Sequence, residues 1–69
     1  MAEEIGERIM AARKARGLTQ QQLGELCGYK GHIAAVSVQN WEHNRSLVPI
    51  ERIRTVSKVL GLTLDRLIP

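Results

Sequence analysis

The segment 19–41 constrains the fold of this chain more than any other, because its pattern predicts two short helices joined by a turn. Gly17 suits the position just after a helix, Thr19 suits the N-cap of the next one, and Gln22 can bond back to the N–H of that cap. Leu18 precedes the cap as an apolar staple residue. The rest of the chain is expected to support the second of these two helices.

The second predicted helix, residues 34–43, has two unlike faces. At about 100° per residue, its inward face carries Ala34, Val38 and Trp41. Its outward face carries Val36, Gln39, Asn40 and His43. A β-branched apolar residue with nothing to pack on is unfavourable in a helix, so an exposed Val36 favours a binding surface over an ordinary solvated face.

The composition predicts a single small all-α domain covering residues 1–69. Sixty-nine residues leave room for only a thin core. The chain has no Phe, one Trp and one Tyr, so its core must be built from Leu, Ile, Val and Ala, which suits closely packed helices better than a β-sandwich. Ten basic against seven acidic residues give a net charge of +3, which favours a polyanionic partner without establishing one.

Several other classes of protein are disfavoured. The single cysteine, Cys27, has no partner for a disulfide or a CxxC site, so we expect a small buried hydrophobe in a protein of the reducing cytoplasm. No apolar run is long enough for a signal peptide or a membrane span. His32 and His43 lie far apart in the sequence with no third ligand at a suitable spacing, so we expect no metal and no cofactor.

Two helices are predicted before the turn, over residues 3–16 and 20–27. The first begins with glutamates and ends with basic residues, which complements the helix dipole. Its inward stripe consists of Ile5, Ile9, Ala12 and, just beyond its end, Leu18. In the second helix Leu23 and Leu26 are expected to point inward, and Gly24 to let a crossing helix approach closely.

A fourth helix is predicted over residues 49–60, with Pro49 at its first position and Gly61 at its end. Its inward residues are Ile50, Ile53, Val56 and Leu60. Its other face, expected to be solvated, carries Arg52, Arg54 and Lys58. Thr63 is expected to cap a short fifth helix, from which Leu67 folds back onto the core.

The chain contains three motifs in a fixed order, Gly17-Leu18-Thr19-Gln20, Val38-Gln39-Asn40-Trp41-Glu42 and Val59-Leu60-Gly61-Leu62-Thr63-Leu64-Asp65. Together they resemble the helix-turn-helix domain of the Cro and lambda-repressor-like family, also called the XRE family. The likeness covers nearly the whole chain. It implies a compact five-helix domain that acts, without catalysis, as a sequence-specific DNA-binding transcriptional regulator, and we expect a repressor from a bacterium or a bacteriophage.

The resemblance implies two sets of DNA contacts, with the third helix as the recognition helix in the major groove. The positions that would read bases, counted back from the tryptophan, are Ala35, Val36, Gln39 and Asn40. Asn and Gln can pair two hydrogen bonds with adenine, and Val or Ala can touch the thymine methyl group. The residues expected at phosphates are Gln20, Lys30, His32, His43, Asn44, Arg45 and Ser46.

The resemblance also implies how the recognition helix is held. Trp41 would lie in the core. Glu42 would pair with Arg13, and as a surface ion pair this would be worth under about 1 kcal/mol while fixing the helix angle. Asn44 suits the left-handed position just after the helix.

The chain departs from the family pattern between the second and third helices. Twelve residues separate Gly28 from Trp41, about four more than members commonly have. Ala34 also stands where members usually have a capping Ser or Thr, so an earlier helix start, with Gly31 or His32 at the cap, is open.

Leu47, Val48 and Leu64 are apolar residues that helix periodicity does not place in the core. We expect a small dimer interface there, and hence a weak homodimer that is strengthened on a palindromic double-stranded operator. The alternative is a protein-interaction or antitoxin-like module on the same fold without specific DNA binding. No nucleophile–base pair, carboxylate pair or phosphate loop stands at a usable spacing, so we expect neither an enzyme nor a small-molecule substrate, and no membrane partner.

Overall fold

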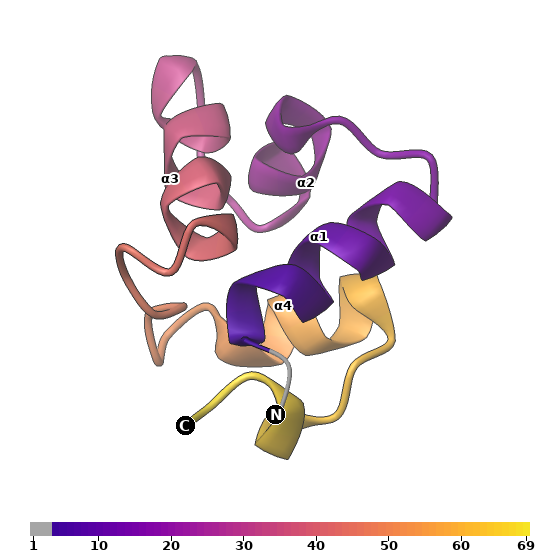
Figure 1. Ribbon diagram of the computed structural model, residues 1–69. Helices are drawn as coiled ribbons and strands as arrows, with labels where there is room; N and C mark the ends of the chain where they lie inside the picture. The colour runs from indigo at the N-terminus through magenta and orange to yellow at the C-terminus, as the bar shows by residue number, and fades with distance from the viewer. Residues whose placement is uncertain (1–3) are drawn as a thin grey trace.

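A computed structural model describes residues 4–69 and shows four α-helices and one turn of 3-10 helix, with no strand in that range (Figure 1). The elements are α1 (Ile5–Ala15), α2 (Gln20–Leu26), α3 (His32–Glu42), α4 (Ile53–Leu60) and η1 (Leu64–Arg66). The all-α prediction is confirmed. The predicted count of five helices is wrong, because the last segment completes only a single 3-10 turn. The predicted first residue of the first helix, Glu3, lies outside the described residues.

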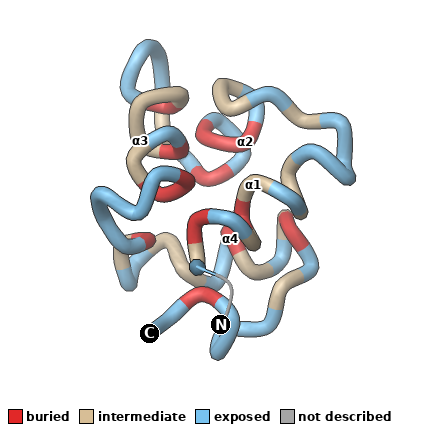
Figure 2. Tube along the Cα trace, in the orientation of Figure 1, coloured by how far each residue is buried: buried red, intermediate tan, exposed pale blue. Residues whose placement is uncertain are grey.

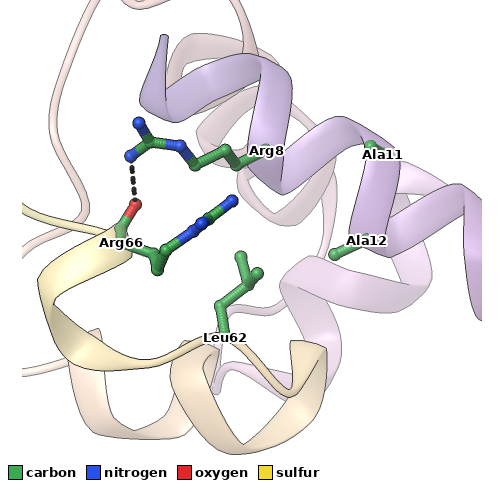
Figure 3. Close-up of a pocket in the computed structure, with 5 residues that line it drawn as sticks. All are labelled: Arg8, Ala11, Ala12, Leu62 and Arg66. Carbon is green, nitrogen blue, oxygen red and sulfur yellow. Dashed lines mark hydrogen bonds between the residues drawn. The ribbon is translucent and has the colours of Figure 1, made fainter. Parts of the chain in front are cut away.

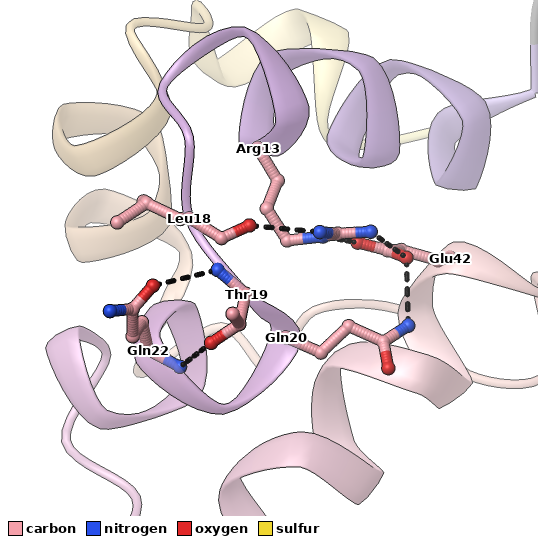
Figure 4. Close-up of polar contacts among 6 residues, drawn as sticks. All are labelled: Arg13, Leu18, Thr19, Gln20, Gln22 and Glu42. Carbon is pink, nitrogen blue, oxygen red and sulfur yellow. Dashed lines mark hydrogen bonds and ion pairs between the residues drawn. The ribbon is translucent and has the colours of Figure 1, made fainter.

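The helix ends follow local sequence signals. Thr19 Oγ1 accepts a hydrogen bond from the Gln22 N–H at 3.0 Å, and Gln22 Oε1 accepts one from the Thr19 N–H at 2.8 Å (Figure 4). This is the predicted capping box at the start of α2. Gly17 ends α1 with φ of +68°, and the Leu18 N–H reaches back to the Arg13 carbonyl at 3.2 Å, which completes a Schellman motif.

The core lies where the four helices meet, and Figure 2 shows buried stretches on each of them, in the loop after α3 and near the C-terminus. Its buried members are Ile9, Leu23, Cys27, Val38, Trp41, Val48, Val56, Leu60 and Leu67. The predictions that Cys27 is a buried hydrophobe and that Leu67 folds back onto the core are therefore confirmed. Since most of these residues are aliphatic, the core depends on close helix packing more than on aromatic bulk.

Two glycines allow the other helices to approach α3. A Cβ atom at Gly24 of α2 would lie 2.2 Å from the carbonyl oxygen of Ala34, which confirms the predicted close crossing. A Cβ atom at Gly6 of α1 would lie 2.4 Å from the carbonyl oxygen of Glu42. Both distances are far below van der Waals contact, so α1 and α2 pack on the backbone of α3 and not only on its side chains.

The predicted fourth helix begins too early. Helix α4 starts at Ile53, and residues 50–52 form a turn in which the Arg52 N–H bonds to the Pro49 carbonyl at 2.9 Å. Ile50, predicted to point inward, is 86% exposed because it precedes the helix and does not share its periodicity. Leu26, also predicted inward, is 53% exposed, since it lies about 100° around the helix axis from the centre of the face formed by the buried Leu23, Gly24 and Cys27.

The predicted dimer residues do not share one environment. Val48 is only 6% exposed and belongs to the core, so its assignment to an interface is wrong. The loop after α3 turns this side chain inward, although no helical period predicts it. Leu47 and Leu64 are exposed, as an interface would require. No helix within residues 4–69 is long and apolar enough to cross a membrane.

Candidate nucleic-acid interface

Helix α3 stands on one side of the molecule, with its N-terminal turn at the end farthest from α4 (Figure 1). It begins at His32, two residues before Ala34, and Gly31 is its N-cap with φ of +64°. The earlier start considered from the sequence is therefore confirmed, with Gly31 and not His32 at the cap. The additional residues are shared between the turn 27–31 and the first turn of the helix. The helix is consequently longer at the end that points away from the core.

The inward face of α3 is the predicted one. Ala34, Val38 and Trp41 are all buried, and Trp41 is confirmed as a core residue. The ring of Tyr29, in the preceding turn, packs on the Trp41 ring with 6.0 Å between centroids. This aromatic contact packs the turn before α3 against the inward face of α3.

The outward face of α3 carries the residues expected to read bases. Gln39 is exposed, whereas Val36 and Asn40 are half-buried, and Ala35 lies half-buried at the edge of this face. His32, Ile33 and His43 complete the exposed surface of the helix. The side chains predicted at bases therefore share one side of one helix, while their contacts with DNA stay a prediction.

A buried polar cluster anchors the C-terminal end of α3 (Figure 4). The Arg13 guanidinium donates from Nε to Glu42 Oε2 at 2.6 Å and from Nη2 to Glu42 Oε1 at 3.2 Å. Its Nη1 donates to the Leu18 carbonyl at 2.9 Å. The Arg13 side chain is 11% exposed and the Glu42 side chain 0%. The predicted pairing is confirmed, but the expectation of a surface pair is wrong, because Gly6 brings α1 close enough to cover the carboxylate.

Gln20 joins the same cluster, since its Nε2 donates to Glu42 Oε1 at 3.0 Å. The side chain is half-buried and its amide nitrogen is engaged within the protein. Its predicted phosphate contact would therefore have to come from the second hydrogen of that amide nitrogen or from its backbone N–H, and it stays a prediction.

Asn44 closes the helix as predicted. It has φ of +57°, and the Arg45 N–H reaches back to the Asn40 carbonyl at 2.9 Å in a Schellman motif. The Asn44 Oδ1 also accepts a hydrogen bond from the Gly6 N–H at 3.0 Å. Asn44 therefore ends α3, as the sequence predicted, and also accepts a hydrogen bond from the first turn of α1, which the sequence did not predict.

The charges around α3 are distributed unevenly. Within residues 30–46 the single carboxylate is Glu42, which is buried and paired with Arg13. The cationic and titratable side chains of this segment, Lys30, His32, His43 and Arg45, are all exposed. Ser46, also predicted at a phosphate, is exposed beside them. This surface therefore presents positive charge without a competing exposed carboxylate from the same segment, which suits an anionic partner.

The sequence did not identify two residues that position α3. Gln21 of α2 donates from Nε2 to the carbonyl of the Gly31 cap at 3.0 Å, which ties the start of α3 to α2. Arg52, predicted on a solvated face, donates from Nη1 to the Cys27 carbonyl at 3.0 Å and lies 4.4 Å from the centre of the Tyr29 ring. No sequence signal points to either contact, because both join segments that are distant or irregular.

The Cys27 thiol lies in the same turn. Burial raises the pKa of this thiol, and the positive charge of Arg52 partly opposes that rise. A thiol held protonated in this way packs as an apolar group. Within residues 4–69 no three His, Cys, Asp or Glu side chains gather at a distance that could hold a metal ion.

A second feature is an open groove of about 360 Å³ between α1 and the segment after α4 (Figure 3). Its lining residues are Arg8, Ala11, Ala12, Leu62 and Arg66. The Arg8 Nη1 donates to the Arg66 carbonyl at 3.1 Å, which ties η1 to α1. This contact holds the C-terminal turn in place and adds nothing to the surface of α3.

A tryptophan-anchored helix that follows a capped, tightly crossing helix, and that presents a polar face flanked by cations, defines the class of helix-turn-helix DNA-binding domains. The helix-turn-helix family model matches residues 9–67, so the chain belongs to this family, in agreement with its resemblance to the Cro and lambda-repressor-like group. Membership places the domain among DNA-binding regulators of transcription and not among enzymes.

One similar protein is the HTH-type transcriptional activator BcrR of Enterococcus faecalis, which is 26% identical over 65 residues. The matched region covers 94% of this chain and 30% of that protein. The chain thus spans about a third of the length of the curated relative that it matches. No solved structure matches the chain significantly.

Proposed function

We propose that this domain binds double-stranded DNA sequence-specifically, with α3 in the major groove, and that it regulates transcription by occupying an operator. The observation that carries the proposal is the surface of segment 30–46, whose one carboxylate is buried and whose cations are exposed. Phosphates on both sides of a groove attract such a surface. A partner of this kind would hold the protein on the nucleoid in the cytoplasm.

The proposed contacts fall into two sets. Val36, Gln39, Asn40 and, at the edge, Ala35 read base edges, since the amides can pair with adenine and the apolar groups can touch thymine methyl groups. The phosphate contacts come from Gln20, Lys30, His32, His43, Asn44, Arg45 and Ser46. Side-chain hydrogen bonds at both ends of α3 keep the two sets in a fixed relation, because Gln21 ties Gly31 to α2 and Arg13 ties Glu42 to α1.

We propose repression as the regulatory outcome, because a small domain that only occupies DNA can exclude another protein from the same site. The name of BcrR describes that relative as an activator. An operator upstream of a promoter would allow the same domain to act positively, so the position of the operator decides the sign.

The first test selects binding sites from a random DNA pool and then measures affinity over a range of salt concentrations. We expect the logarithm of the affinity to fall linearly with the logarithm of salt concentration, because each neutralised phosphate releases counterions. A flat dependence would exclude the DNA-binding proposal. Binding of a protein in place of DNA would instead support the interaction module considered from the sequence.

The second test separates the two sets of contacts on the selected operator. Asn40→Ala and Gln39→Ala should each lower discrimination at particular base pairs by about 1 to 3 kcal/mol, whereas Arg45→Ala should weaken binding to all sequences alike. Lys14→Ala, an exposed basic residue on α1, is the matched control for lost charge. If Arg45→Ala changed base preference and Asn40→Ala did not, the proposed orientation of α3 would be incorrect.

We further propose a weak homodimer on a palindromic operator, with half-sites about one helical turn apart. After the loss of Val48 to the core, the exposed apolar residues available for it are Leu47, Ile50, Leu64 and Ile68. Leu64→Glu should abolish cooperative filling of the palindrome and leave half-site binding nearly intact, whereas Ala15→Glu, which adds the same charge at an exposed residue at the end of α1, should leave both unchanged. Undiminished cooperativity in Leu64→Glu would move the interface to another surface.

A further inference from the structure

The first turn of α3 contains an exposed apolar side chain that neither the core nor the proposed dimer uses. Ile33 is 57% exposed, although isoleucine is among the residues most often found buried. The first turn of α3, to which Ile33 belongs, lies at the end of that helix farthest from α4 and from the chain termini (Figure 1). The exposed leucines considered for dimerisation follow α3 or lie near the C-terminal end, so Ile33 is remote from them along the fold.

The helical period aligns Ile33 with the residues proposed to read bases. Val36 follows it by three positions and Asn40 by seven, so the three side chains lie along one side of α3. At about 1.5 Å of rise per residue, Ile33 and Asn40 are roughly 10 Å apart along the axis, close to the height of three stacked base pairs. Ile33 extends this surface into the turn that the additional residues of the chain create.

The neighbours of Ile33 narrow the choice of partner. Lys30 and His32 flank it and are exposed, and segment 30–46 has no exposed carboxylate. The Glu25 carboxylate of α2 lies behind the Gly31 cap, where Gln21 Nε2 donates both to Glu25 Oε2 and to the Gly31 carbonyl. An apolar side chain that continues the base-reading side of α3 and has an exposed lysine nearby suits the wall of a DNA groove better than it suits an apolar protein surface. Among the edges of bases in the major groove, the one apolar group is the 5-methyl group of thymine.

We infer that Ile33 is a specificity-determining residue that contacts the 5-methyl group of a thymine, at a position beyond the base contacted by Val36. The inference rests on the proposed function and adds a base position to it. Isoleucine offers no hydrogen bond, so it selects thymine over the other bases only by covering this methyl group.

The test uses the selected operator with each thymine replaced singly by deoxyuridine, which removes the methyl group and nothing else. Wild-type protein should lose affinity about threefold to tenfold at one such position, the range expected for removing one buried methyl group with its packing contacts. Ile33→Ala should show a similar loss on the unmodified operator and no further loss with uracil at that position. Leu26→Ala, which also truncates an exposed apolar side chain but lies on α2 outside the proposed DNA contacts and the proposed dimer residues, should behave as wild type.

Each other outcome overturns the inference in a distinguishable way. If wild-type protein binds DNA with the expected salt dependence, but Ile33→Ala keeps full affinity or full sensitivity to every uracil, this inference fails and the proposed function stands. The inference also fails, and the proposed function stands, if the operators selected from the random pool show no preferred thymine beyond the base contacted by Val36. If Ile33→Ala changes self-association and not the response to uracil, Ile33 contacts protein and not DNA. If wild-type protein binds no DNA, both proposals fail together.

Discussion

Removal of Arg13 tests whether the Arg13–Glu42 pair acts as a buried or a surface interaction. Arg13→Ala deletes two hydrogen bonds to Glu42 and one to the Leu18 carbonyl. The Glu42 carboxylate, 0% exposed, would retain only the amide of Gln20. The variant therefore leaves a charge in the protein interior with one partner in place of two.

The burial of the Glu42 carboxylate sets the expected loss of unfolding free energy in Arg13→Ala. Breaking a buried pair by removing one member costs about 3 to 5 kcal/mol, because the remaining charge stays desolvated. A surface pair would cost under about 1 kcal/mol. A chain of 69 residues has a total stability of roughly 3 to 10 kcal/mol, so Arg13→Ala should be at the edge of folding at 25 °C.

Urea unfolding measures this loss, with the fluorescence of Trp41 as the signal. Trp41 is the one tryptophan of the chain, is 3% exposed, and becomes solvated on unfolding. Lys14→Ala, an exposed basic residue in the same helical turn, is the matched control and should cost less than about 1 kcal/mol. The double variant Arg13→Met with Glu42→Leu should regain most of the lost stability, because it removes both charges and keeps the volume.

A loss below about 1 kcal/mol for Arg13→Ala would refute the reasoning, since it would mean that water reaches the Glu42 carboxylate. A large loss that the double variant does not regain would also count against it. That result would assign the stability to the packing of Arg13 itself, and not to the burial of an unpaired charge.

Two further predictions concern the close packing of α2 on α3 and the buried thiol of Cys27. Gly24→Ala should destabilise the domain by more than about 2 kcal/mol, although alanine has the better helix propensity, because the new Cβ would lie 2.2 Å from the Ala34 carbonyl oxygen. Gly17→Ala has open space around the new Cβ but a φ of +68°, so it should cost only about 1 to 2 kcal/mol. Equal losses in urea unfolding would contradict the close approach. The raised pKa of Cys27 favours the protonated thiol in the folded state, so stability should be fully present below the ordinary thiol pKa of about 8.5 and decline as pH rises through the raised value. Cys27→Ala should lack this decline, and an identical pH profile in both proteins would refute the assignment.

The sequence predicted the elements whose causes are local. The capping box at Thr19 and the left-handed position of Asn44 depend on residues within one turn of each other, so their patterns were sufficient. The inward face of α3 follows from the helical period, because the same three side chains, Ala34, Val38 and Trp41, recur on one side. Local chemistry therefore determined where α2 begins, where α3 ends and which side of α3 packs.

The features that the sequence did not predict depend on how distant segments meet. Val48 lies in irregular backbone after α3, where no period says which way a side chain points, and the loop turns it into the core. The burial of Glu42 depends on α1 approaching at Gly6, thirty-six positions earlier in the chain. Arg52 contacts the turn before α3 only because the segment preceding α4 packs there. Such contacts require the tertiary arrangement itself.

The burial of Glu42 also connects the stability of the domain to its proposed function. The net charge of +3 says little about DNA binding, because the effect of the seven carboxylates depends on where they lie. Carboxylates on the surface of α3 would repel the phosphates and weaken binding. The pair with Arg13 removes the one carboxylate of segment 30–46 from that surface and uses it to hold the C-terminal end of α3 against α1. A carboxylate in this place is compatible with phosphate contacts by Arg45, three positions away, only while Arg13 neutralises it. Loss of Arg13 should therefore weaken DNA binding beyond its effect on folding, because it disorders the end of α3 and exposes a negative charge beside the phosphates.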